Sequence, residues 1–159
     1  MALKGDRIEF LSDVSYFMNS VAERGGIVSL SGTGGSGAAM DQAANLVSEV
    51  ASPSGAKPVG ILMQDVVNID LTRQHLNDYK AEVQKGGKVC VLRQGYVVTN
   101  KIQGTPTAGS PAYVGHSGLI SATNVGGASY TAMVIGEFRS SKDQDGYAKV
   151  DINLPATTR

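Results

Sequence analysis

The glycine tract at residues 32–37, Gly-Thr-Gly-Gly-Ser-Gly, is the segment whose spacing suggests the most specific chemistry. When a Gly-x-Gly-x-x-Gly run joins a strand to a helix, the backbone can approach a pyrophosphate and the helix N-terminus stabilises its charge. An acidic residue is expected about 20 positions further on, and neither Glu49 nor Asp65 fits that distance. Ala38 also replaces the lysine of a Walker A loop. A nucleotide-binding enzyme that uses Gly32–Gly37 is therefore kept as an alternative function.

Metal binding is the next chemistry that the residue types allow. The carboxylate and imidazole groups that could hold a divalent ion belong to Asp65, Asp70, His75 and Asp78, but their spacing matches no known ligand set. Asp143 and Asp145 precede Gly146 as in part of a calcium loop, yet the closing glutamate is missing. The sequence favours a solvated loop in the first case and a hairpin turn in the second, and predicts no metal site.

Nucleophilic catalysis has no suitable arrangement of side chains. His116 and Ser117 are adjacent in an expected turn, so their side chains point apart, and the Gly-x-Ser-x-Gly pattern is absent there. Cys90 is the single cysteine and lies between two valines, which favours a small core residue over a reactive thiol. One cysteine and two histidines also do not suffice for a Cys/His zinc site within one chain. We expect no enzymatic activity and no cofactor.

The charge balance excludes several classes of partner. Fourteen Lys and Arg residues match fourteen Asp and Glu residues, so the chain has no broad attraction for nucleic acid or anionic membranes. No run approaches the roughly 20 apolar residues of a membrane span, and the N-terminus lacks the apolar stretch of a signal peptide. We therefore expect that the chain does not contact membranes. We also expect that it is synthesised in a cytoplasm. Charged residues make up 18% of the chain, below the typical ~25%, which favours a surface partly covered in an assembly.

Length and glycine content indicate the fold class. The 159 residues fit one domain, and 20 glycines with abundant valine indicate short strands separated by turns. Strands are expected at 27–30 and 59–63, the latter followed by Val66, Val67 and Ile69. Hairpins are expected to pair 88–92 with 96–102 around Arg93-Gln94-Gly95, 112–114 with 119–122, and 132–139 with 147–154. We predict a mainly β domain over 1–159, a small barrel or sandwich with extended arms and at most one or two short helices.

Two segments have apolar residues at helical spacing. In residues 13–24, Val14, Phe17, Met18 and Val21 fit one face of a helix, although Val14, Tyr16 and Met18 also fit the alternation of a strand. Periodicity alone favours the helix. Residues 38–51 likewise fit a helical face that Ser52-Pro53 would end. Helix and strand stay open for both segments.

The order of several sequence blocks resembles head decoration, or cement, proteins of tailed bacteriophages. These blocks are ALKGDRIEF, SYFMNSVAERGGIVSL, GAKPVGILMQDVVNIDLTRQH, KAEVQKGGKVCVLRQGYVVTNKI with its GTPTAG turn, and SKDQDGYAKVDINLP. Residues 31–37 and 121–129 are the parts without a match. The resemblance implies strand structure at Tyr16–Asn19, contrary to the helical spacing.

The resemblance also implies a function. It implies a non-enzymatic subunit on the outer surface of an icosahedral capsid, which reinforces contacts between major capsid proteins and is commonly a homotrimer. The localisation would be the virion. A β module of a phage tail or fibre is the second alternative function.

Three mixed-polarity segments are the expected capsid or subunit interfaces: an N-terminal arm at 1–7, the polar stretch at 70–85 and the tail at 155–159. Arg and Tyr are the residue types that most often anchor protein interfaces. The candidate interface residues are Leu3, Lys4, Arg7, Asp70, Arg73, His75, Tyr79 and Arg159.

Overall fold

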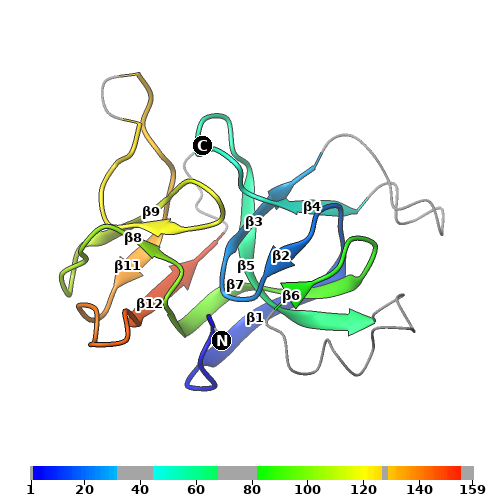
Figure 1. The fold of residues 1–159 in the computed structure, drawn as a ribbon, viewed down its shortest axis with the longest axis horizontal. Helices are drawn as coiled ribbons and strands as arrows, with labels where there is room; N and C mark the ends of the chain where they lie inside the picture. The colour runs from blue at the N-terminus through cyan, green and yellow to red at the C-terminus, as the bar shows by residue number, and fades with distance from the viewer. Residues whose placement is uncertain (1, 32–44, 68–81, 127–128, 155–159) are drawn as a thin grey trace.

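The computed structural model describes residues 2–31, 45–67, 82–126 and 129–154, with the backbone alone at 65 and 67. Within these ranges the chain forms strands and no helix, which confirms the predicted mainly β class (Figure 1). The strands are β1 (Ile8–Met18), β2 (Ala22–Glu23), β3 (Ile27–Leu30), β4 (Leu46–Glu49), β5 (Pro58–Val67), β6 (Glu82–Val83), β7 (Lys88–Thr99), β8 (Ile102–Gln103), β9 (Pro111–Val114), β10 (Ile120–Ser121), β11 (Val134–Phe138) and β12 (Ala148–Asn153). No helix of the described part is long and apolar enough to cross a membrane.

Five strands close a small barrel. They follow the order β1-β4-β3-β5-β7, and β1 also pairs with β7, so that the ring is complete. The β1–β4 pair is parallel and the other four pairs are antiparallel. Each strand contributes to one buried cluster, which contains Met18, Val28, Val47, Leu62 and Val91. This cluster is the barrel interior.

The remaining strands form a second lobe beside the barrel. From β7 the sheet continues through β12, β11, β9, β10 and β8. Figure 1 shows this lobe on the left and the barrel on the right, with β7 reaching from one to the other. A larger apolar cluster joins Ile27, Ile61 and Leu92 of the barrel to Ile120 and Val150 of the second lobe. Consecutive residues of β3, β5 and β7 thus face opposite cores, as the two-residue period of a strand requires.

The strand predictions are confirmed where neighbours along the chain pair with each other. β9 pairs with β10, and β11 pairs with β12, in the two hairpins expected at 112–122 and 132–154. The expected strands at 27–30 and 59–63 correspond to β3 and the first half of β5. These pairs follow from local turn chemistry.

The predicted hairpin around Arg93-Gln94-Gly95 is wrong. β7 runs without a turn from Lys88 to Thr99. It pairs on one edge with β5 and then β12, and on the other edge with β1. Gly95 has a φ of +146° and forms part of an irregularity in the β1–β7 pairing. The glycine therefore serves a distorted strand and not a chain reversal.

The helix favoured by periodicity for residues 13–24 is wrong as well. β1 and β2 cover most of that segment, which confirms the strand that the resemblance implied at Tyr16–Met18. Tyr16 and Met18 alternate into the barrel interior while β7 pairs along the strand. Of the second possible helix, residues 38–44 lie outside the described residues, and Leu46–Glu49 is strand β4.

The carboxylate of Asp143 stabilises the turn between β11 and β12, which is the hairpin turn expected from the sequence. Its Oδ1 accepts hydrogen bonds from the backbone N–H groups of Asp145 and Tyr147 at 3.0 and 2.8 Å. Its Oδ2 lies 3.3 Å from Lys4 Nζ. The bond from Tyr147, reinforced by Lys4, holds the pKa of Asp143 below its ordinary value of 3.8.

Replacing Asp143 with asparagine is expected to remove a pH-dependent part of the stability. Because the folded pKa lies below the unfolded one, ionised Asp143 stabilises the folded chain above about pH 4, and this contribution is lost as the pH falls further. Asp143→Asn keeps acceptors for both backbone bonds, so its melting temperature at pH 7 should fall by only a few degrees. The melting temperatures of the two chains should converge as the pH falls well below the unfolded pKa. A difference that stays constant with pH would contradict the role of the charge.

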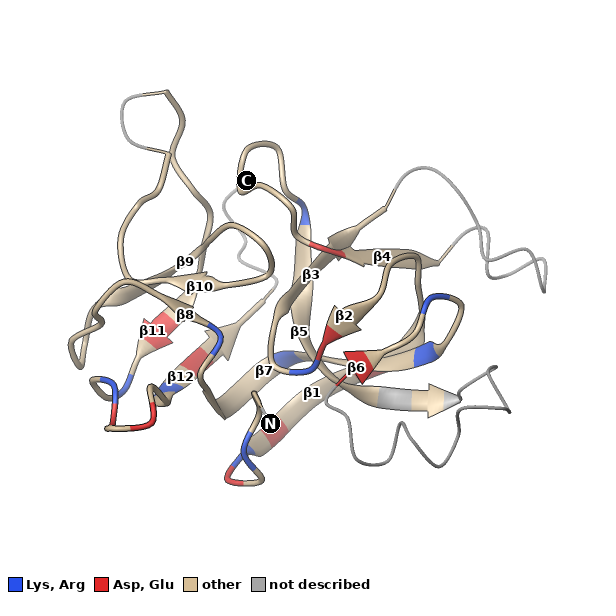
Figure 2. Cartoon of the chain, viewed as in Figure 1, with Lys and Arg blue, Asp and Glu red and all other residues tan. Residues whose placement is uncertain are grey.

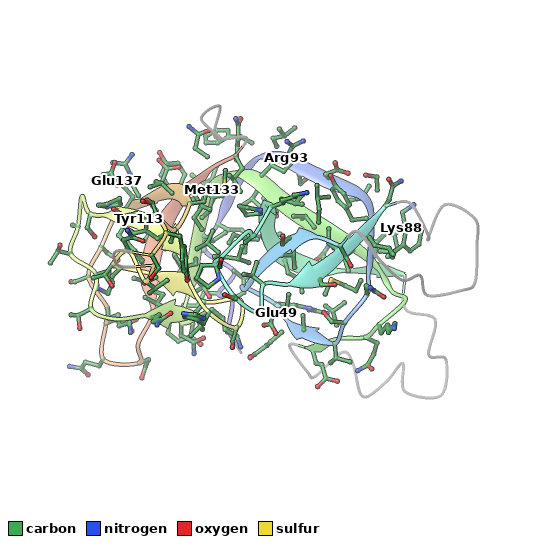
Figure 3. All side chains as sticks on the ribbon, turned by 90° about the horizontal axis from the view of Figure 1, so that it is seen from above. Glu49, Lys88, Arg93, Tyr113, Met133 and Glu137 are labelled. Carbon is green, nitrogen blue, oxygen red and sulfur yellow. The ribbon has the colours of Figure 1, made fainter. Side chains whose placement is uncertain are left out.

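The barrel and the second lobe also meet at the β9–β10 turn. Gly118 donates its N–H to the Val50 carbonyl at 2.7 Å and accepts from the Ile27 N–H at 2.8 Å. Glu49 is half-buried at this contact, between the two lobes (Figure 3). Burial raises the pKa of the Glu49 carboxyl, which Lys101 opposes and Glu23 reinforces.

Glu49→Gln is expected to stabilise the chain at neutral pH. Since the folded pKa is raised, ionisation of Glu49 costs stability above the folded value, and this cost disappears below the unfolded value. The carboxyl is only partly buried, so solvent screening limits the gain to about 0.5 kcal/mol, or roughly 1–2 °C in melting temperature at pH 7. The control is Glu23→Gln, which loses the 2.5 Å ion pair with Lys101 and should not stabilise. A lower melting temperature for Glu49→Gln would refute the assignment.

Candidate interaction surface

The first half of β1 is exposed on the outside of the barrel. β4 pairs with β1 only at Phe17 and Met18, whereas β7 pairs with β1 from Ile8 onward. Ahead of Phe17, the second edge of β1 has no strand partner among the residues that the structure describes. Four large apolar side chains lie on this part of the strand, and we call them the β1 patch: Ile8 (50% exposed), Phe10 (70%), Leu11 (42%) and Val14 (49%). A group of exposed apolar side chains along one strand is a candidate interaction site.

Irregular pairing with β7 explains how these side chains come to be exposed. Register shifts occur at three places along β1, between Glu9 and Leu11, Leu11 and Ser12, and Asp13 and Tyr16. Such irregularities interrupt the alternation of side chains between the two faces. The ring of Phe10 packs edge-on against Tyr96, with centroids 6.2 Å apart, and Lys149 Nζ lies 5.2 Å from the Tyr96 centroid. Phe10 is thus positioned by a β7 neighbour while most of its surface faces solvent.

Charged groups of both signs lie around the β1 patch. Arg7 Nε lies 2.6 Å from Glu9 Oε1. Asp13 Oδ1 accepts hydrogen bonds from both the N–H and the hydroxyl of Ser15, and the hydroxyl bond, with Arg93 nearby, lowers the pKa of Asp13. Figure 2 shows both signs of charge at the N-terminal end of β1. Apolar side chains bordered by charges of both signs fit a protein partner better than a polyanion.

The irregular backbone of β1 limits how a partner can bind. Bulges on an edge strand hinder the regular addition of another strand. The bulges do not hinder binding through the exposed side chains of the β1 patch. Such binding needs a complementary apolar surface on the partner but no regular backbone pairing with it. The arrangement therefore supports side-chain docking with Phe10 as the most exposed anchor.

The N-terminal arm differs from the sequence prediction. Ala2 and Leu3 are buried, and Leu3 belongs to the cluster shared by the two lobes, so residues 2 and 3 are not part of an exposed arm. Ala2 and Leu3 enter the core because burial of their apolar side chains is favourable, whereas residues 5–7 are exposed and the interface role of the arm stays a prediction. Lys4 contacts Asp143, and Arg7 pairs with Glu9 next to the β1 patch.

The other candidate interface residues are not placed by the structure. Asp70, Arg73, His75, Tyr79 and Arg159 lie outside the described residues, so their interface role stays a prediction. The glycine tract Gly32–Gly37 lies outside them too.

Cys90, His116 and Ser117, the residues considered for nucleophilic chemistry, lie in the described part of the chain. Cys90 is buried, as predicted, and burial raises the pKa of its thiol. His116 and Ser117 occupy the turn between β9 and β10, where Ser117 has a φ of +51°. Across the described ranges, no three His, Cys, Asp or Glu side chains are grouped as a metal site would need.

Sequence reasoning missed the β1 patch. Its signal was the alternation of Ile8 and Phe10 with Arg7 and Glu9, which is typical of a strand. That alternation lies between the arm at 1–7 and the segment that begins at residue 13, so neither prediction included Ile8 and Phe10.

Comparison with known proteins agrees with this architecture. The family model described as "Structural cement protein (E217 gp24/Pam3 gp6)" matches residues 13–153, from the middle of β1 to the last residue of β12. No curated protein matches the chain. The match covers both the barrel and the second lobe. The chain therefore belongs to the phage structural cement protein family.

Proposed function

We propose that this chain binds the outer surface of an icosahedral phage capsid and stabilises contacts between neighbouring major capsid proteins. The family match over residues 13–153 is the observation that carries the proposal, because a cement protein has a structural role in the capsid. Membership in a structural family also points away from enzymatic activity. In this proposal the protein needs no cofactor, works in the virion and acts as a homotrimer.

Many weak contacts can together stabilise a capsid. Packaged DNA exerts outward pressure on the capsid. Under this pressure the capsid fails at the contacts between capsid proteins. A subunit that touches two capsid proteins makes its second contact at a high effective concentration, so that weak contacts together hold strongly. Each contact needs on the order of 1,000 Å² of complementary surface.

The β1 patch is the part of the described surface that best suits such a contact. Phe10 is the most exposed of the large apolar side chains in the described ranges. An exposed aromatic side chain with a fixed position is the usual anchor of a protein interface. We therefore assign the capsid contact to the β1 patch, together with Arg7 at its edge.

Addition of the purified protein to capsids that lack it tests the function. The temperature at which heads release their DNA should rise as the added protein saturates them, and electron microscopy should show new density on the outer surface. Sedimentation should give the mass of three chains. Unchanged heads together with binding to purified tails would support the tail or fibre alternative and refute the proposal.

A further inference from the structure

Residues Ala2–Lys4 lie between the barrel and the second lobe, where β7 passes from one to the other (Figure 1). Leu3 forms an antiparallel bridge with Thr99 at the end of β7. The Lys4 N–H donates to the Val98 carbonyl at 2.8 Å, and the Asn100 N–H donates to the Ala2 carbonyl at 3.0 Å. These two bonds surround the Leu3–Thr99 pair, so the segment extends the sheet by one short strand.

The barrel is shaped to receive this segment at Gly25. Gly25 has a φ of +90°, and a Cβ there would lie 2.8 Å from Thr99 Oγ1 and 3.3 Å from Leu3 Cβ. The Thr99 hydroxyl also donates to the Gly25 carbonyl at 3.3 Å. A side chain at position 25 would therefore occupy the space that Leu3 and Thr99 use.

The same segment reaches the second lobe through Lys4. Lys4 Nζ lies 3.3 Å from Asp143 Oδ2 and 4.1 Å from the centroid of the Tyr147 ring. Three consecutive residues thus contact the Gly25 loop of the barrel, the end of β7 and the β11–β12 turn. Only Gly5, Asp6 and Arg7 separate Lys4 from Ile8, so the segment also fixes where β1 begins.

We propose that Ala2–Lys4 is a latch that fixes the first residues of β1 against β7 and thereby positions the β1 patch for attachment. Residues 8–13 pair with β7 along one edge only, so they depend on an anchor at their N-terminal end. When the latch is closed, Ile8 and Phe10 are already ordered before they contact a partner. Binding then does not include the entropy cost of ordering them. The positioning of the β1 patch for attachment rests on the proposed function, because the partner in that step is the capsid.

A reversible disulfide tests the latch. Leu3 and Thr99 form a non-hydrogen-bonded antiparallel pair, whose Cα atoms are typically about 4.5 Å apart, within the range of a disulfide. The double variant Leu3→Cys and Thr99→Cys is made with Cys90→Ser, which removes the native thiol. The oxidised form has a closed latch, and the reduced form lacks the Leu3 side chain, so one protein supplies both states.

Amide exchange and head binding are measured on both forms. Exchange at Asn100 should be about tenfold faster in the reduced form, while exchange at Ser31, whose N–H donates to the Leu46 carbonyl in the barrel away from the Gly25 loop, should not change. Binding to heads should weaken about tenfold on reduction and recover on reoxidation. Lys4→Ala should weaken binding in the same direction, and Lys57→Ala, at an exposed lysine away from the latch, should not.

Each result decides one part of the proposal. Equal exchange at Asn100 in the two forms would show that residues 2–4 do not act as a latch. Different exchange with equal head binding would show that the latch does not position the β1 patch. If the parent chain itself does not bind heads, the proposed function fails, and the exchange data still judge the latch.

Discussion

A chain with alanine in place of Gly95 is expected to be about 3 kcal/mol less stable than the parent and to lose the regular contact between β1 and β7. Gly95 has a φ of +146°, a conformation that residues with a Cβ rarely adopt. A Cβ at this position would also overlap the Ile8 carbonyl oxygen. Both atoms involved belong to backbones that are paired, so neither can move without breaking the β1–β7 contact.

Urea unfolding of the Gly95→Ala variant measures this loss. The matched control is Gly5→Ala, because Gly5 has an ordinary φ and open space where a Cβ would be. The control should unfold within about 0.5 kcal/mol of the parent. If Gly95→Ala and Gly5→Ala unfold at the same urea concentration, the close approach at Ile8 does not exist in solution.

Gly95 also shows why part of the fold cannot be predicted from the residues of one segment alone. A glycine between two apolar runs is the usual signal of a hairpin turn, and Arg93-Gln94-Gly95 has that signal. The residues that keep β7 one continuous strand are distant in sequence, because β1 and β12 pair with it on opposite edges near this point. A turn and an irregular strand need the same backbone freedom, so composition alone does not separate them.

The same distinction separates the confirmed predictions from the wrong ones. The hairpins β9–β10 and β11–β12 join neighbours along the chain, so their turn residues sufficed to predict them. In residues 13–24 the apolar residues fit both periods, and closure of the barrel decided for the strand. The mainly β class was predictable because glycine and valine content constrain the whole chain and not one segment.

The candidate surface was predictable only in part. The mixed polarity of residues 1–7 predicts Lys4 and Arg7 as interface residues, and Arg7 does lie beside the β1 patch. Leu3 and Phe10 are both apolar residues in polar surroundings, yet Leu3 is buried and Phe10 is exposed. The difference arises from the space beside Gly25, which accepts Leu3, and from the irregular β1–β7 pairing, which turns Phe10 outward. Neither cause is visible in a single sequence.

Phe10→Glu is expected to weaken attachment to heads by about 30-fold while leaving the fold intact. An aromatic anchor at the centre of an interface contributes about 2 kcal/mol, which corresponds to that factor in affinity. A carboxylate would add the cost of burying an unpaired charge against the partner. Since Phe10 is 70% exposed, its replacement removes little buried area from the chain itself. The melting temperature of the free protein should therefore stay close to that of the parent.

Binding of labelled protein to undecorated heads measures the effect, with Val134→Glu as the matched control. Val134 is an exposed apolar residue, 42% accessible, on β11 of the second lobe. The control introduces the same charge on the same protein but outside the β1 patch, so it should bind as the parent does. Equal losses for the two variants would mean that added negative charge alone disturbs attachment. Full binding by Phe10→Glu would remove the β1 patch from the capsid contact and leave the segments at 70–85 and 155–159 as the candidates, because their residues were the other anchors expected from the sequence.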